Sequence, residues 1–188
     1  MSESKFWSSP FAEPKRAYRW LCFLGGAGST NELHPWAVRS VKKPSFSVTN
    51  AQHSYIGHNF FFPGRVTWDP VEVTFVDPVT PDVSSGLVER LSASGYKLPT
   101  NEASAKFSLN KKGTTEAFGA VTIQQIDSQG NPLEEWSLKN AWVERMDFGQ
   151  LDYTSEELVT VTVSFRYDYA TFDASMHEGG FAFTDGNS

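Results

Sequence analysis

The side chains of this sequence that could do acid–base chemistry are concentrated in its C-terminal third. A glycosidase needs two carboxyl groups facing each other across a cleft, and sequence spacing alone does not place any two of these together. Asp147-Phe148-Gly149 spells the metal-binding triplet of protein kinases, but the accompanying catalytic and glycine-rich loops are absent. We therefore expect no catalytic residues and no enzyme activity. The carboxylates in question are Glu134, Glu135, Glu144, Asp147, Asp152, Glu156 and Glu157.

The histidines and glycine-rich segments give no pattern typical of a metal or phosphate site. His53 and His58 fall on opposite faces of one expected strand, and zinc ligands need tight, recurrent spacing. The glycine-rich run at 25–30 lacks the lysine of a phosphate-binding loop. Residues 127–131 are typical of a hairpin turn rather than a calcium loop, which would end in a bidentate glutamate. We expect no metal and no cofactor.

The composition is that of a soluble globular chain. The 188 residues are 39% hydrophobic and 20% charged, the net charge is −6, and Cys22 is the only cysteine. No apolar run is long enough for a membrane span, and the N-terminus lacks the apolar segment of a secretory signal. Residues 1–50 hold seven basic and three acidic side chains, whereas residues 126–188 hold three and twelve. Such segregation permits head-to-tail association between copies, although two solvated faces explain it equally well.

The hydrophobic pattern predicts a mainly β protein. From Val159 to Tyr169 apolar and polar residues alternate strictly, which is typical of a half-buried antiparallel strand. One helix is expected at about residues 82–95, with Asp82 or Ser84 as its cap. Segment 97–113 is polar and is expected to form a turn at Lys111-Lys112-Gly113. Further strands are expected at 16–24, 36–43, 45–50, 54–62, 66–76, 120–126 and 133–146.

These elements predict one antiparallel β-barrel or sandwich with a single packed helix. Its expected limits are residues 16–172. A flexible arm, 1–15, precedes it and a flexible tail, 173–188, follows. Pro70 interrupts the strand at 66–76, which suits an edge or a bulge.

Three consecutive aromatic residues, Phe60, Phe61 and Phe62, lie on one expected strand. Consecutive strand residues point to opposite faces, so both faces must be covered, either within the chain or by another subunit. We favour the second alternative. The predicted subunit interface comprises Phe60, Phe61, Phe62, Trp68, Val71, Val73 and Phe75.

The C-terminal pattern resembles the tail tube proteins of contractile-tailed, T-even-like bacteriophages, a family shared with related injection systems. The resemblance rests on Lys139-Asn140-Ala141-Trp142-Val143, on Phe148-Gly149-Gln150-Leu151-Asp152-Tyr153 and on the strand that ends at Tyr169. It extends more faintly over 14–172, where 14–24 and 67–77 are similar to family strands and 82–96 stands at the family's helix. The arm, the 25–35 loop and the tail depart from the family's pattern.

The resemblance implies a structural virion protein in the phage tail, assembled in the host cytoplasm. Its expected partners are further copies in stacked hexameric rings, a contractile sheath outside, and a baseplate initiator and a terminator at the ends. Phage DNA would pass through without specific binding, which a net negative charge favours. No membrane anchor is expected. The alternatives are a baseplate tube initiator, an injection-system tube subunit or, in another class, a β-sandwich module that binds a carbohydrate or small ligand.

Overall fold

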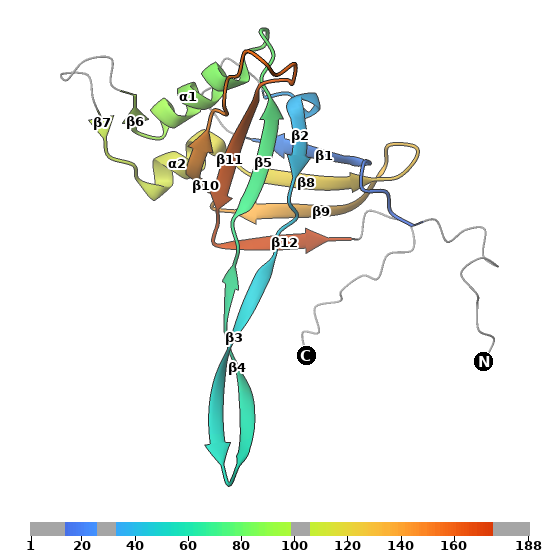
Figure 1. Ribbon diagram of the computed structural model, residues 1–188, viewed down its shortest axis with the longest axis vertical. Helices are drawn as coiled ribbons and strands as arrows, with labels where there is room; N and C mark the ends of the chain where they lie inside the picture. The colour runs from blue at the N-terminus through green and yellow to red at the C-terminus, as the bar shows by residue number, and fades with distance from the viewer. Residues whose placement is uncertain (1–13, 26–32, 99–105, 175–188) are drawn as a thin grey trace, which may run out of the picture.

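The computed structural model describes residues 14–25, 33–98 and 106–174. At 106–107 it describes the backbone but not the side chains. Most of these residues lie in antiparallel strands (Figure 1). The elements are β1 (Trp20–Leu24), η2 (Pro35–Ala37), β2 (Val38–Val41), β3 (Phe46–Tyr55), β4 (His58–Trp68), β5 (Val71–Val76), α1 (Val83–Ala93), β6 (Tyr96–Lys97), β7 (Lys106–Phe107), α2 (Lys111–Phe118), β8 (Val121–Ile126), β9 (Pro132–Lys139), β10 (Trp142–Asp147), β11 (Thr160–Arg166) and β12 (Tyr169–Asp173).

Two four-stranded sheets form the body of the molecule. One has the strand order β1-β8-β9-β12 and the other has the order β10-β11-β5-β2, with every neighbouring pair antiparallel. The strands of one sheet run across those of the other, and the core lies between them (Figure 1). This crossed arrangement is one of the two ways in which sheets pack face to face. The prediction of an antiparallel β fold is therefore confirmed.

The core follows the period-2 pattern of the two central strands. Val71, Val73 and Phe75 on β5 are fully buried, and so are Val161 and its alternate neighbours on β11. Since successive side chains of a strand point to opposite faces, each strand turns one apolar row inward. The opposite sheet contributes Cys22, Val121, Ile123 and Leu138.

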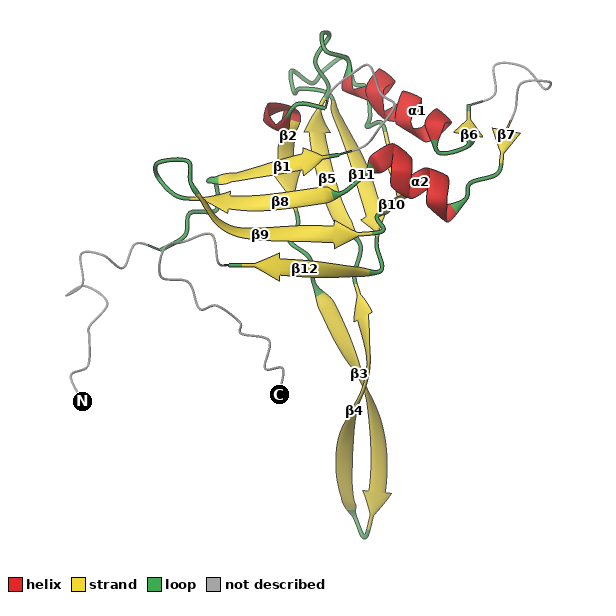
Figure 2. Ribbon diagram, turned by 180° about the vertical axis from the view of Figure 1, so that it is seen from behind, coloured by secondary structure: helices red, strands yellow, loops and turns green. Residues whose placement is uncertain are grey.

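Two helices cover one end of the sandwich, beside β10 and β11 (Figure 2). The predicted helix α1 is confirmed, and the Asp82 carboxylate accepts the Ser85 amide at 2.9 Å as its cap. The prediction of a turn at 111–113 is wrong, because α2 begins there. Asn110 caps this second helix by accepting the Gly113 amide at 2.6 Å. Gly113 lies so close to α1 that an added Cβ would stand 3.2 Å from the Ser94 carbonyl oxygen.

Three segments that the sequence pattern predicts as single strands each form two strands in different sheets, and one of them, 66–76, divides into β4 and β5 at Asp69-Pro70. The run 133–146 divides into β9 and β10 at Asn140, whose φ of 56° turns the chain through a corner. The alternating run 159–169 divides into β11 and β12 at Asp168. The two corners lie side by side, since the side-chain amide nitrogen of Asn140 donates a hydrogen bond to the Asp168 carboxylate at 2.7 Å.

The β3–β4 hairpin projects from the sandwich along the long axis of the molecule (Figure 1). It is longer than the sequence pattern predicts, and its turn is Ile56-Gly57, where both residues have positive φ. Pro70 lies between β4 and β5 rather than on an edge strand. β5 is instead a central strand, paired with β11 and β2.

The predicted arm 1–15 and tail 173–188 lie mainly outside the described residues, as does most of the 25–35 loop. Lys15, within the predicted arm, forms an ion pair with Glu134 on β9.

Candidate subunit interface

The hairpin is the most exposed regular element among the described residues. All ten residues of β3 and every residue of β4 except Trp68 are exposed. The two strands pair with each other, and no other element lies over either face (Figure 1). An isolated two-stranded hairpin is marginally stable in water. The element therefore gains stability from any surface that covers it.

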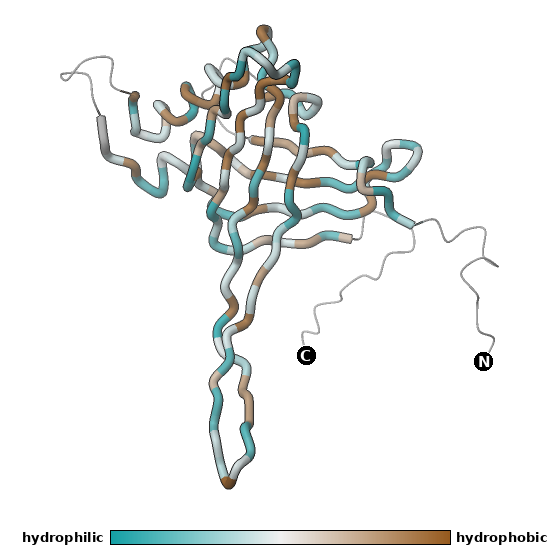
Figure 3. Tube along the Cα trace, viewed as in Figure 1, coloured by the Kyte–Doolittle hydropathy of each residue, from teal (hydrophilic) through white to brown (hydrophobic). Residues whose placement is uncertain are grey.

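The aromatic run predicted to face another subunit lies on this hairpin. Phe60, Phe61 and Phe62 are 49%, 64% and 55% exposed. Their cross-strand partners are His53, Gln52 and Ala51, which are too polar or too small to cover the rings. Figure 3 shows hydrophobic segments along both strands and at the tip. Other exposed apolar side chains of the hairpin are Phe46, Val48, Tyr55, Ile56 and Val66.

The other residues predicted for the interface lie elsewhere. Val71, Val73 and Phe75 have no exposed surface and pack in the core of the chain itself. Both edges of their strand are also paired. The sequence pattern misleads here, because the same alternation of apolar and polar residues marks a core strand and an interface strand.

Trp68 belongs to an aromatic cluster at the base of the hairpin. Its ring lies 5.1 Å from that of Phe46 and 5.8 Å from that of Tyr167, measured between centroids. At this base, the chain entering β3 and the chain leaving β4 are joined by a hydrogen bond, in which the Asp69 backbone amide donates to the Ser45 carbonyl oxygen at 2.9 Å. Burial, with Asp69 nearby, raises the pKa of Tyr167 to about 12. Trp68 thus anchors the hairpin to the sandwich and is only partly exposed.

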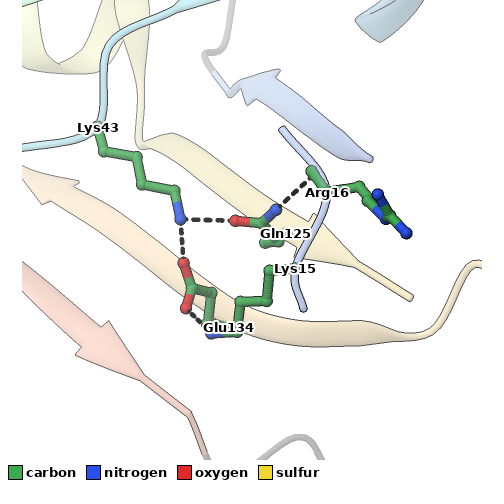
Figure 4. Close-up of polar contacts among 5 residues, drawn as sticks. All are labelled: Lys15, Arg16, Lys43, Gln125 and Glu134. Atoms are coloured by element: carbon green, nitrogen blue, oxygen red, sulfur yellow. Dashed lines mark hydrogen bonds and ion pairs between the residues drawn. The ribbon is translucent and has the colours of Figure 1, made fainter. Parts of the chain in front are cut away.

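A buried carboxylate holds the hairpin base from the other sheet. Glu134 on β9 accepts from Lys43, which lies just before β3, and from Lys15 (Figure 4). Lys43 also donates to the Gln125 side chain at 2.6 Å, and Gln125 donates to the Arg16 carbonyl at 2.8 Å. Burial raises the pKa of Glu134, but the hydrogen bonds from the two lysines outweigh it and the pKa is lowered. The carboxylate therefore stays charged although its side chain is only 8% exposed.

A second apolar surface lies at the end of the molecule opposite the hairpin, in the loop between β10 and β11 (Figure 1). Leu151, Tyr153 and Leu158 are 81%, 111% and 69% exposed. They line an open hollow of about 550 Å³ together with Asp152 and Glu157. In the sequence, this segment is noted only for its resemblance to the tail tube family, at residues 148–153. The signal for an apolar surface was the presence of three large apolar residues in one loop between two strands, 148–159.

The carboxylates considered for catalysis have structural partners in several cases. Asp147 accepts the Gly149 amide at 3.0 Å and Arg145 at 3.0 Å, so its pKa is lowered. Asp152 accepts the Thr154 amide at 2.8 Å, which lowers its pKa. Glu144 pairs with Arg166 at 2.8 Å. These contacts stabilise turns and sheet faces.

His53 lies on β3 and His58 on β4, rather than on one strand as expected. They are not cross-strand partners, since His53 lies opposite Phe60 and His58 lies opposite Tyr55. Among the described residues, no three histidine, cysteine or carboxylate side chains are grouped as a metal site requires. Cys22 is buried, which raises its pKa to about 12. Within the same part of the chain, no helix has the length and apolar character needed to cross a membrane.

Comparison with known proteins agrees with the resemblance seen in the sequence. The family described as T4-like virus tail tube protein gp19 matches residues 102–171. No curated protein sequence matches the chain. The matched family segment contains α2 and every strand from β8 to β11.

Solved structures of contractile injection systems contain chains with a similar fold. A chain of the anti-feeding prophage baseplate is 17% identical, with a TM-score of 0.60 over 87% of this chain and 97% of its own length. A chain of the sheath/tube terminator of an extracellular contractile injection system is 16% identical, with a TM-score of 0.61 over 87% and 99%. A chain of the sheath–tube complex of the same kind of system is 15% identical, with a TM-score of 0.57 over 93% and 99%.

The family is described as a tail tube protein, and the similar chains belong to a baseplate, a sheath/tube terminator and a sheath–tube complex. The most exposed regular element in the described part of this chain is the projecting hairpin with its aromatic run. The chain therefore has the fold of tail tube proteins, and its residues 102–171 carry the sequence pattern of the T4-like virus tail tube family.

Proposed function

We propose that this chain is a structural subunit that self-assembles into the inner tube of a contractile tail. Copies form hexameric rings, and the rings stack into a hollow conduit inside a sheath. In a phage tail that conduit delivers the genome. The observation that carries the proposal is the exposed hairpin, with its aromatic run at residues 60–62, on a tail tube fold.

The hairpin has the physical features of an obligate contact. It presents aromatic side chains that a solvated strand would not retain, and its two outer edges carry unpaired backbone groups. The sandwich anchors its base through Trp68 and Lys43, so it is held in a defined direction. Strand β5 has a paired neighbour on each side, so it offers no free edge for pairing with another copy.

The expected partners follow from the same proposal. A sheath would surround the tube, an initiator would begin it at the baseplate and a terminator would end it. The titles of the similar structures name a baseplate, a sheath–tube complex and a sheath/tube terminator. An initiator, or the tube subunit of an injection system that carries no genome, is the second candidate, because these assemblies contain chains of this fold. In a phage the protein would be located in the virion tail.

The test is negative-stain electron microscopy of the full chain with its mass determined by light scattering. Rings of six or hollow filaments are expected. A variant with Phe60→Ser, Phe61→Ser and Phe62→Ser should remain folded and lose assembly. Leu109→Ser, at an exposed apolar residue outside the hairpin, is the matched control and should assemble normally. A monodisperse monomer at every salt and protein concentration would overturn the proposal.

A further inference from the structure

Strand β2 forms an open edge of the sandwich, on the flank away from the helices (Figure 1). It pairs with β5 on one side, and no strand of the described residues pairs with its other side. Just beyond β2, the Lys42 amide donates to the Glu72 carbonyl oxygen on β5 at 3.0 Å. Residues of an antiparallel strand alternate between bonding to the partner strand and pointing away from it. The backbone N–H and C=O of Val41 therefore point to the open edge.

Two hollows lie along this edge and join each other. Their volumes are about 470 Å³ and about 400 Å³. Both are lined by Ala17, Trp20 and Val41, so they form one continuous groove between β2 and the segment that leads into β1. Ile123, on β8 of the opposite sheet, gives the second hollow an apolar wall. The groove thus combines an open strand edge with an apolar interior.

The walls of the groove are basic. Arg39 lines the first hollow, and Lys15 and Lys43 line the second. The wall segments 14–20 and 38–45 contain six lysine or arginine residues and no aspartate or glutamate. The two lysines share a single carboxylate, that of Glu134 (Figure 4), so their charge is only partly neutralised.

Arg39 also lies at an irregularity of the strand. The register of β2 on β5 shifts between Val38 and Ser40, so Arg39 is the extra residue of a β-bulge. Bulges are frequent at sheet edges and beside functional sites, where they redirect a side chain. Here the bulge places an exposed guanidinium in the lining of the groove.

These features together specify the chemistry of a ligand. An open strand edge binds an extended peptide through main-chain hydrogen bonds, and pockets beside the edge select its side chains. Successive side chains of the bound strand point to opposite sides, so apolar residues at alternate positions can enter the hollows. The basic walls favour acidic residues between them. A nucleic acid would satisfy the cations but has no peptide groups to pair with Val41.

We infer that the β2 edge is a binding site for an acidic, extended peptide segment of another protein, which adds a strand to the β10-β11-β5-β2 sheet. Residues 39–43 extend about 16 Å at roughly 3.3 Å per residue, so the bound segment has about five or six residues. Its apolar side chains contact Trp20, and its carboxylates meet Arg39 and the two lysines. The groove is separate from the exposed strands of the hairpin, so this binding does not require assembly.

Fluorescence anisotropy of a labelled six-residue peptide tests the site. The probe alternates glutamate with valine or phenylalanine and is titrated with the full chain, and saturable binding is expected. One control probe has lysine in place of glutamate. A second control keeps the side chains but carries N-methyl groups at alternate backbone nitrogens, which removes the donors needed for edge pairing. Both controls should bind at least about tenfold more weakly.

Two variants of the groove and one matched control locate the contact. Ala17→Trp fills the groove from an exposed wall, and Arg39→Glu reverses the charge at the bulge. Each should weaken binding of the glutamate peptide at least about tenfold. Lys97→Glu makes the same change in net charge at an exposed residue beside the helices, and should leave binding unchanged.

Amide hydrogen exchange provides a readout that charge attraction alone would not move. The Val41 amide should exchange more slowly when the glutamate peptide is bound, because its N–H then donates to the peptide. Unchanged exchange at Val41 would show that the peptide contacts only the lysine and arginine side chains, and would overturn the inference.

The remaining outcomes are equally decisive. Absence of binding, equal binding of either control probe, or native affinity in Ala17→Trp overturns the inference. A six-nucleotide oligothymidylate that binds as tightly as the glutamate peptide assigns the groove to nucleic acid and also overturns it. None of these results depends on whether the chain forms filaments, so the proposed tube function stands or fails separately.

Discussion

The β3–β4 hairpin and the β5–β11 pair are built from similar residues but differ in burial. Both are antiparallel pairs rich in valine and phenylalanine. Phe75 and Phe165 are fully buried, whereas Phe61 is 64% exposed. The difference lies in what covers each pair. β5 and β11 lie under a second sheet and the helices, but the hairpin extends beyond both. Sequence pattern thus shows that a strand has an apolar face and leaves open which molecule covers that face.

The largest expected effect comes from truncating one phenylalanine in each region. Phe165→Ala removes a ring that packs against Phe118 at 6.0 Å in the core, and we expect a loss of about 3 to 5 kcal/mol in unfolding free energy. Phe61→Ala, the matched variant on the hairpin, should change monomer stability by under about 0.5 kcal/mol and weaken assembly. Urea unfolding and light scattering measure the two effects. Equal destabilisation by both variants would mean that the hairpin is covered within its own chain.

The next effect concerns the carboxylate that ties the hairpin base to the opposite sheet. Glu134→Gln weakens charge-assisted hydrogen bonds from Lys15 and Lys43, for which about 1 to 3 kcal/mol is typical. Both lysines are about half exposed, so water can solvate them in the variant. Urea unfolding at neutral pH measures the loss. Glu144→Gln, at an exposed ion pair, is the control and should cost less.

The same carboxylate makes a specific prediction for pH. The pKa of Glu134 is lowered in the folded state, because the hydrogen bonds of Lys15 and Lys43 outweigh the opposing effect of burial. Its contribution is therefore complete above the ordinary pKa of a glutamate, about 4.3. It is lost as the pH falls through the lowered value. The stability difference between the native chain and Glu134→Gln should shrink over this range. A difference that stays constant into strong acid would contradict the assignment.

The smallest effect concerns the corner that separates the two sheets. Asn140 has a φ of 56° and donates to Asp168. Asparagine tolerates the left-handed region because its polar side chain forms local hydrogen bonds, and alanine lacks that group. Asn140→Ala should therefore lower the unfolding free energy by about 1 to 2 kcal/mol. Asn140→Gly keeps the conformation without strain and should cost less. If alanine and glycine cost the same by thermal unfolding, the hydrogen bond rather than the backbone conformation dominates.

The sequence alone determined the strand character of the chain and its first helix. Strict alternation at Val161, Val163 and Phe165 required one buried face, and Asp82 marked the start of α1. These features depend on local periodicity and capping, which act within a few residues. The resemblance to tail tube proteins came from the same segments, since the order of turns and strands is itself a linear property.

Only the tertiary structure decided the corners, the second helix and the assignment of apolar faces. Asn140 and Asp168 end strands that the pattern would continue, because each chain segment must cross to the other sheet there. Lys111–Phe118 becomes helical through packing on α1 and a cap at Asn110, although its glycine lowers its helical propensity. Val71 is buried and Phe61 is exposed because the second sheet covers β5 but not the hairpin. Hydrophobic side chains show that a face of a strand must be covered. Long-range packing decides which other part of the protein, or which other subunit, covers it.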